Sequence, residues 1–214
     1  MNLSIRTFAL GTMAVALFAA TSVAHADPIP YNHTGTVAPF VPLVATNTGT
    51  ITAYFWGGDA GDNDSIELYD FNSGLTSTAV LLNHGSLSPG DSTVFSIGVT
   101  AGDSIAFILV DGNTGVPFSS DPTVPFVNSD GINHAYITPY LGPTDPAGDP
   151  SNLIPAGTFV GFEDRFSPPS DLDYNDDEFV FTNVSTVTPE PSSIILLGSG
   201  LLAAAGLVRR RMSA

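Results

Sequence analysis

The stretch Ser65-Ile-Glu-Leu-Tyr-Asp-Phe71 decides the fold, because its side chains alternate between apolar and polar. Successive side chains of a strand point to opposite faces. Ile66 and Leu68 therefore share one face, and Asp70 continues it. Glu67 and Tyr69 lie on the opposite face. This period of two predicts a strand with one face in a hydrophobic core.

Similar extended runs occur on both sides of this stretch, and each is bounded by Gly, Pro, Asp or Asn. We expect strands within residues 50–56, 93–99, 104–110, 133–138, 158–162 and 178–183. Many short strands separated by turn residues are typical of an all-β fold. The sequence therefore predicts an antiparallel β-sandwich or jelly-roll over residues 27–183, followed by a linker at 184–191. The loop-rich stretches 111–131 and 139–155 are expected to be surface loops.

A short internal repeat relates two neighbouring segments. Residues 89–98 (PGDSTVFSIG) and 101–110 (AGDSIAFILV) each begin with a Gly-Asp turn that leads into an apolar run. The spacing of twelve residues suits adjacent strands joined by a tight turn. We therefore expect the two copies to form one hairpin of the sandwich.

Composition excludes several classes of function. The 214 residues include 21 acids and five basic residues, with a formal charge of −16, no lysine and no cysteine. Without lysine there is no P-loop lysine or Schiff base, and without cysteine there is no disulfide or thiolate site. Binding of nucleic acid is not expected, because affinity for phosphate comes from clustered Lys and Arg.

The N-terminus has the pattern of a secretory signal. Arg6 precedes an apolar run, and the small residues Ala24 and Ala26 flank His25 at an expected cleavage position. We therefore expect a signal helix over residues 1–26. An uncleaved membrane anchor is the alternative.

The C-terminus carries a second apolar run over residues 192–208, followed by Arg209, Arg210 and Arg211. Seventeen helical residues extend about 25 Å, close to the ~30 Å of a hydrocarbon core. A positive cluster directly after an apolar run is typical of a stop-transfer segment. We therefore expect a transmembrane helix over 192–211 that attaches the chain to the membrane.

Three residues ahead of this run, Pro189, Glu190 and Pro191, complete a pattern that resembles the PEP-CTERM sorting signal. The resemblance covers about residues 188–214. It implies export across the inner membrane of a Gram-negative bacterium and a membrane-anchored precursor. It also implies processing by an exosortase-type protease and a final location at the cell surface or outside the cell, often with extracellular polysaccharide.

Acids gather in two clusters of the middle domain. The first cluster, on a Gly-rich turn, comprises Asp59, Asp62, Asp64 and Glu67. The second cluster shares the single Arg165, and its candidate ligands are Glu163, Asp164, Asp171, Asp173, Asn175 and Asp176.

Calcium is the cation that this pattern favours. Ca²⁺ takes six to eight oxygen ligands, often from closely spaced Asp and Asn on a turn. Asp171, Asp173 and Asn175 have the spacing of the first three EF-hand ligands, but Asp176 and Thr182 stand where that motif needs Gly and Glu. A loop of another kind, closed by Glu163 or Asp164, is therefore expected. The alternative is that the acids are solvated turn residues, and we favour this alternative for the first cluster.

Residues 161–176 also resemble the C-terminal part of an uncharacterised β-domain of bacterial surface proteins. The shared pattern is F-E-D, a gap, then D-x-D-Y-N-D, and it begins here at Phe162 and ends at Asp176. Such domains often occur beside sorting signals or calcium-dependent modules. The resemblance implies a surface location, and it provides no catalytic assignment to carry over.

The function expected from these features is structural or adhesive, at the cell surface or in an extracellular matrix, with bound Ca²⁺. A polysaccharide-binding module is the first alternative, with Tyr54, Phe55, Trp56 and Tyr69 as an aromatic platform. Burial of these rings in the core is the competing interpretation, and we favour it. A secreted glycoside hydrolase that uses two of the acids is a weaker alternative. No Ser-His-acid or metalloprotease motif is present, so we assign no catalytic residues.

Overall fold

Twelve strands and no helix occupy the part of the chain that the computed structural model describes, which is residues 29–61, 63–81, 87–144, 148, 149 and 151–187. The strands are β1 (Leu43–Ala45), β2 (Thr52–Gly57), β3 (Ser65–Asp70), β4 (Leu75–Thr76), β5 (Val80–Leu81), β6 (Ser92–Val94), β7 (Ser104–Val110), β8 (Pro117–Ser119), β9 (Ala135–Tyr140), β10 (Gly157–Phe162), β11 (Asp177–Thr182) and β12 (Val184–Thr186).

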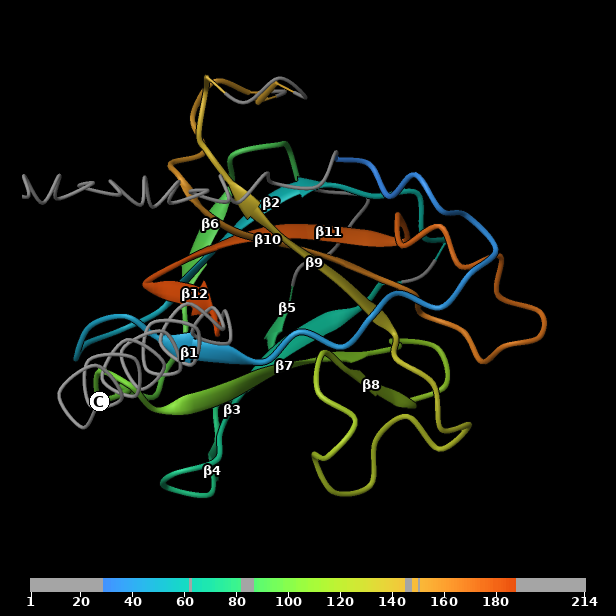
Figure 1. Cartoon of the computed structure of the whole chain (residues 1–214), viewed down its shortest axis with the longest axis horizontal. Coiled ribbons are helices and arrows are strands. Elements are labelled where there is room, and N and C mark those ends of the chain that lie inside the picture. The colour runs from blue at the N-terminus through green and yellow to red at the C-terminus, as the bar shows by residue number, and fades with distance from the viewer. Residues whose placement is uncertain (1–28, 62, 82–86, 145–147, 150, 188–214) are drawn as a thin grey trace, which may run out of the picture.

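Two antiparallel sheets are packed face to face. The seven-stranded sheet runs β12-β1-β7-β3-β4, with β5 added beside β3 and β8 beside β7. The five-stranded sheet runs β6-β2-β11-β10-β9. Figure 1 shows the five-stranded sheet above β1, β7 and β3 of the other. Two stacked antiparallel sheets confirm the predicted all-β class and are consistent with a sandwich.

The expected flanking segments fall outside this description. The signal helix at 1–26 and the sorting helix at 192–211 lie beyond the described residues. Within the described ranges, no helix has the length and apolar character that crossing a membrane requires.

The predicted face pattern of residues 65–71 is confirmed by burial. Ile66 and Leu68 are fully buried between the sheets, whereas Glu67 and Tyr69 are partly exposed on the other side of β3. The same alternation places Phe179 and Phe181 of β11 in the core between the sheets. Phe107 of β7 stacks on Phe181 with ring centroids 3.6 Å apart, so the two sheets meet through aromatic rings.

A second apolar layer covers the outer face of the five-stranded sheet. Phe159 and Val180 point to this face, and the segment from Ile29 to Ala38 packs across them together with Tyr174. The N-terminal segment of the domain therefore shields one side of β10 and β11.

The predicted hairpin of the repeat is wrong. β6 pairs with β2 in one sheet, and β7 pairs with β3 and β1 in the other. The two Gly-Asp turns are nevertheless alike, since Asp91 Oδ2 accepts from the Ser88 N–H at 2.8 Å and Asp103 Oδ2 accepts from the Thr100 N–H at 2.6 Å. The chain crosses between sheets because each copy places a phenylalanine in the shared core, Phe95 from one side and Phe107 from the other.

Two boundaries also differ from the prediction. β12 forms from residues 184–186, which were expected to begin the linker, because they pair with β1. β8 lies inside the expected surface loop 111–131, and Phe118 there is buried. Both strands are only three residues long, so local sequence gave too weak a pattern to find them.

Candidate metal centre

The loop between β10 and β11 carries the acids of the second cluster. Its residues alternate in burial, since Leu172 and Tyr174 are buried whereas Asp171, Asp173 and Asn175 stay at least partly exposed. Leu172 and Tyr174 have left-handed φ values of 55° and 59°. This backbone lets the apolar side chains anchor the loop while the polar ones remain on a common side.

Tyr174 fixes the loop to the domain. Its side chain is 1 % exposed, and its hydroxyl donates to the Asn133 carbonyl at 3.0 Å and accepts from the Ala38 N–H at 2.8 Å. Burial raises the pKa of this hydroxyl to about 12. The hydroxyl therefore keeps its proton at neutral pH and can serve both bonds.

The backbone of the loop approaches β10 so closely that residue 161 has to be glycine. A Cβ atom on Gly161 would lie 2.2 Å from the Tyr174 carbonyl oxygen, well inside van der Waals contact. In the Gly161-Phe162-Glu163-Asp164 sequence, Gly161 allows the loop backbone to approach and Phe162 ends β10. Glu163 and Asp164 then provide the first two acids of the cluster.

Glu163 connects the strand to the loop. Its side chain is 1 % exposed; Oε1 accepts from the Tyr174 N–H at 2.5 Å, and Oε2 accepts from the Ser170 hydroxyl. Burial raises the pKa of Glu163, and the carboxylates of Asp176 and Asp171 add to this effect. A buried carboxylate among others is a position where a cation would be strongly stabilised.

Three carboxylates come together at this point. One oxygen each from Glu163, Asp171 and Asp173 lies within 4.8 Å of the others. Asp173 Oδ1 is inaccessible to solvent and has no hydrogen-bond donor among the described residues, while Asp173 Oδ2 accepts from the Asn175 amide at 2.9 Å. Burial, followed by the charge of Asp171, raises the pKa of Asp173. Oxygen ligands of this kind suit Ca²⁺.

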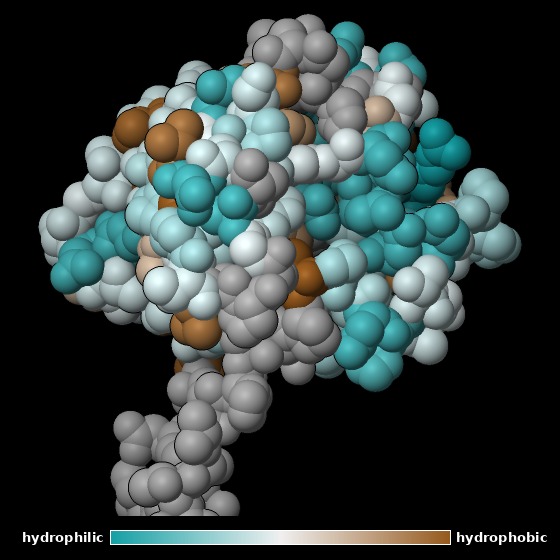
Figure 2. Space-filling view, turned by 90° about the horizontal axis from the view of Figure 1, so that it is seen from above, coloured by the Kyte–Doolittle hydropathy of each residue, from teal (hydrophilic) through white to brown (hydrophobic). Residues whose placement is uncertain are grey.

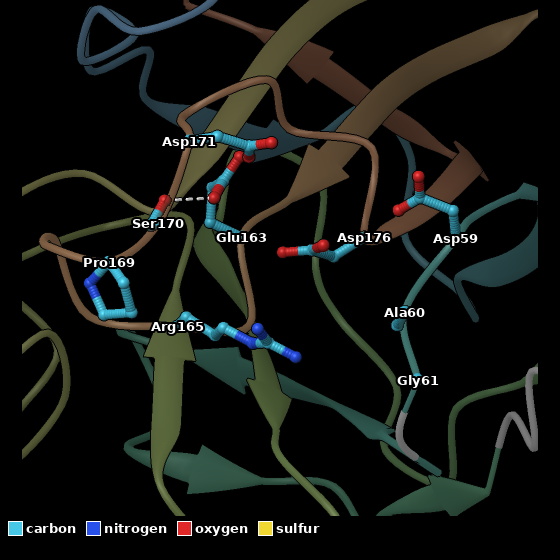
Figure 3. Close-up of a pocket in the computed structure, with 9 residues that line it drawn as sticks. All are labelled: Asp59, Ala60, Gly61, Glu163, Arg165, Pro169, Ser170, Asp171 and Asp176. Carbon is cyan, nitrogen blue, oxygen red and sulfur yellow. Dashed lines mark hydrogen bonds between the residues drawn. The ribbon is translucent and has the colours of Figure 1, made fainter.

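A pocket of about 260 Å³ opens beside the three carboxylates. Figure 3 shows the Glu163 and Asp171 side chains on one side of it, Asp176 pointing into it and Asp59 on the far side. Figure 2 shows hydrophilic residues gathered on the side of the molecule where the β10–β11 loop lies in Figure 1. The pocket therefore forms part of a polar end of the sandwich.

The members of the first acidic cluster that the structure describes, Asp59, Asp64 and Glu67, do not gather into a site of their own. Backbone hydrogen bonds of 3.0 Å from Asp59 and Ala60 to the Asn175 and Asp176 carbonyls bring Asp59 to the pocket of the second cluster. Asp64 is buried and does not line this pocket. Glu67 lies on the face of β3 opposite to the buried Ile66 and Leu68. Asp62 lies outside the described residues. Alternation along β3 separates Asp64 from Glu67. Asp59 is placed by its contact with the β10–β11 loop, which no local motif reveals.

Not all of the second cluster faces the three carboxylates either. Glu163 and Asp164 are consecutive, so they point to opposite sides of the strand. Asp164 is 2 % exposed, and its Oδ1 lies 3.5 Å from Arg165 Nε. Asp176 Oδ2 accepts from the Asp164 N–H at 2.9 Å and lies between the two sides. Ser170 and Tyr174 were not predicted, because hydroxyl and backbone support carries no sequence signal of its own.

The aromatic platform of the polysaccharide-binding alternative is not assembled. Phe55 is buried between the sheets, while Trp56 packs edge-on against Tyr140 and Phe159 at centroid distances of 5.1 and 5.9 Å. Tyr69 lies on the other sheet, where it contacts Phe71. Alternation along β2 separates neighbouring rings, so the four do not share a surface.

Fold and site together define an all-β domain with an acid-lined pocket at one end of its sandwich. Residues 187–211 match the PEP-CTERM protein-sorting motif, which confirms the resemblance drawn from Pro189-Glu190-Pro191 and the arginine end. The motif implies export, processing by exosortase and a membrane-anchored sorting signal in a Gram-negative bacterium. No curated protein and no solved structure matches the chain. The resemblance of the middle domain therefore stays a prediction.

Proposed function

We propose that this chain is a structural or adhesive protein of the cell surface or extracellular matrix, and that Ca²⁺ bound by Glu163, Asp171 and Asp173 rigidifies its exposed end. The signal peptide at 1–26 and the helix at 192–211 would deliver the domain to the outside. The sorting motif supports export to the cell surface, and the geometry of the three carboxylates supports binding of Ca²⁺.

The observation that carries the calcium proposal is the solvent-inaccessible Asp173 Oδ1, which has no donor among the described residues, in a side chain that has one carboxylate oxygen within 4.8 Å of oxygens of Glu163 and Asp171. Solvated turn acids would keep their oxygens in water. Three protein carboxylates leave room for waters or a second oxygen from the same carboxylates, as a six- to eight-coordinate ion needs.

The test is thermal unfolding of the full chain in detergent, with Ca²⁺ compared with NaCl at equal ionic strength. Ca²⁺ should raise the unfolding temperature, and Asp173→Ala should abolish the increase. Asp103→Asn, which removes a charge from a distant turn, should respond like wild type. Equal unfolding temperatures in Ca²⁺ and NaCl would falsify the calcium proposal.

A structural role at the surface has its own test, because bound ions alone do not define a function. Cells that display the wild-type chain should retain it at the surface in Ca²⁺ and release or unfold it in chelator. Retention that is unchanged in chelator would separate the calcium site from surface attachment and would count against the structural role of the ion.

A further inference from the structure

A second pocket opens beside the ends of three strands of the seven-stranded sheet. It lies where the start of β1, the start of β7 and the residue after β3 meet the loop that follows β8. β1, β7 and β3 are neighbours in that sheet (Figure 1). The pocket has a volume of about 290 Å³, at the lower end of the ~300–1,000 Å³ that is typical of small-molecule sites. It shares no lining residue with the pocket of the candidate metal centre.

One part of this pocket is apolar and is held in place by the fold. Leu43 and Ile105 are paired across β1 and β7 and are 3 % and 1 % exposed, so they form its base. Phe71 also lines the pocket, and its half-buried ring packs edge-on against Tyr69 at a centroid distance of 4.9 Å. The Phe71 N–H donates to the Ser104 carbonyl at 3.0 Å. An aromatic ring is therefore fixed at the pocket with part of its surface open to a ligand.

Three polar side chains, of Ser104, Asp121 and Thr123, line the same pocket. Asp121 Oδ1 accepts from the Thr123 N–H at 2.8 Å and from the Thr123 hydroxyl at 2.7 Å. Within the described ranges, no protein group donates to Asp121 Oδ2, and the Ser104 hydroxyl has no protein partner. The pocket thus offers a carboxylate acceptor together with hydroxyl groups, which can both donate and accept.

The loop that carries Asp121 and Thr123 is fixed before any ligand binds. The Asp121 N–H donates to the Ser119 hydroxyl at 3.1 Å. The Asn128 side chain bonds the Ser119 backbone twice, at 2.7 Å to its N–H and at 3.0 Å to its carbonyl. Val124 is 5 % exposed and packs on β7. A site that is ordered in advance loses less entropy when it binds.

The chemistry of the pocket selects a neutral ligand that carries hydroxyl groups. A carboxylate needs a hydrogen-bond donor from the ligand, and an aromatic ring needs an apolar face. A sugar ring supplies both, because hydroxyls project from its rim and C–H groups cover its faces. An amine could donate to Asp121 but would offer no acceptor to Ser104. Anions are disfavoured, since Arg165, the one Lys or Arg of the described ranges, lines the other pocket.

We propose that this pocket binds one sugar unit of a neutral glycan, with the Phe71 ring against a C–H face of the sugar. Asp121 accepts from the sugar hydroxyls, and Ser104 and Thr123 complete the polar contacts. Such a site goes beyond a structural role, because it gives the domain a ligand of its own. It does not depend on bound Ca²⁺, since the two pockets have no residue in common.

The chain's own C-terminal segment is the competing occupant of the pocket. It begins close by, because the Val187 N–H donates to the Pro42 carbonyl at 2.9 Å and Pro42 lines the pocket. The first charged residue of that segment is Glu190, which Asp121 would repel. A neutral sugar meets no such repulsion, so the pocket favours the sugar.

The test is saturation-transfer NMR of the full chain in a detergent without a sugar headgroup, with EDTA present to keep Ca²⁺ from the loop site. The neutral probes are cellohexaose, laminarihexaose, mannohexaose and xylohexaose, and the anionic probe is hexagalacturonate. Wild type should transfer saturation to at least one neutral probe and none to hexagalacturonate.

Titration with the neutral probe that binds gives the affinity of each variant. Phe71→Leu keeps an apolar side chain but removes the ring, so it should weaken binding by about 2–10-fold. Asp121→Asn keeps an acceptor for Thr123 but replaces one acceptor oxygen, so it should weaken binding by about 10-fold or more. Phe126→Leu changes a phenylalanine that is 97 % exposed and does not line the pocket, so this matched control should bind like wild type.

Weaker binding by Asp121→Asn supports the site even if circular dichroism shows that Phe71→Leu fails to fold. Unchanged affinity of folded Asp121→Asn overturns the proposal, and so does equal binding of hexagalacturonate by wild type. Binding of none of the neutral probes also overturns it, including the case in which the C-terminal segment fills the pocket. None of these outcomes bears on the calcium proposal, because EDTA is present throughout.

Discussion

The backbone N–H of Tyr174 donates a 2.5 Å hydrogen bond to Glu163 Oε1, eleven positions earlier in the chain. This bond holds Glu163, the acid that directly follows β10, against the turn that presents Asp171 and Asp173. It makes Glu163 both a candidate ligand and a structural support, and these two roles can be separated by substitution.

Replacing Glu163 with glutamine should weaken Ca²⁺ binding at the loop by at least about 10–100-fold, because that range is typical for changing a residue that only supports a metal ligand. The glutamine carbonyl can still accept from the Tyr174 N–H, so the fold should survive. Calorimetric titration with Ca²⁺ gives the affinity, and circular dichroism checks the fold. An unchanged affinity with intact structure would remove Glu163 from the ligand set.

Replacing Tyr174 with phenylalanine should destabilise the domain by about 1–3 kcal/mol, because two buried hydrogen bonds, to Asn133 and Ala38, are lost. The loop should also bind Ca²⁺ more weakly, since its anchor is loosened. Urea unfolding measures the stability. Tyr69→Phe on the other sheet is the control, and equal stability of the two variants would contradict the anchoring role.

Replacing Gly161 with alanine should cost about 1–3 kcal/mol, the usual range for forcing extra atoms into packed structure. The new Cβ would meet the Tyr174 carbonyl at 2.2 Å, so β10 and the loop would have to separate. Gly98→Ala is the matched control, because its Cβ would meet its nearest neighbour at an ordinary 3.6 Å. Equal unfolding temperatures of the two variants would show that β10 and the loop can move apart at residue 161 without loss of stability.

The stabilising effect of Asp149 should depend on pH. Its carboxylate accepts from the Ser151, Asn152 and Ile154 N–H groups and from the Ser151 hydroxyl. Burial alone would raise the pKa of Asp149, but these hydrogen bonds outweigh it and lower the pKa. A lowered pKa in the folded state means stability that is present above the unfolded pKa of about 3.9 and is lost as pH falls through the folded value.

Asp149→Asn keeps one oxygen acceptor and removes the charge, so it should cost about 1 kcal/mol at pH 7 and progressively less below pH 4. Urea unfolding of both proteins at several pH values, all with the same chelator, measures the difference. A difference that stays constant from pH 7 to pH 3 would show that the charge of Asp149 contributes nothing.

Sequence periodicity by itself determined the class of fold and much of the core. Alternation along 65–71 assigned Ile66 and Leu68 to the interior, and the strands at 104–110, 158–162 and 178–183 lie where they were expected. Alternation depends only on neighbouring residues, so it can be read without knowing the fold. The sorting signal is likewise a local pattern, and the motif match confirms it.

Only the tertiary structure decided which acids meet. Asp59 and Asp64 are close in sequence, yet Asp59 joins the loop pocket and Asp64 joins Asp177 inside the sandwich. The two copies of the repeat form similar turns, but their strands belong to different sheets. Strand order and sheet pairing depend on contacts between residues distant in sequence, and a local pattern cannot specify them.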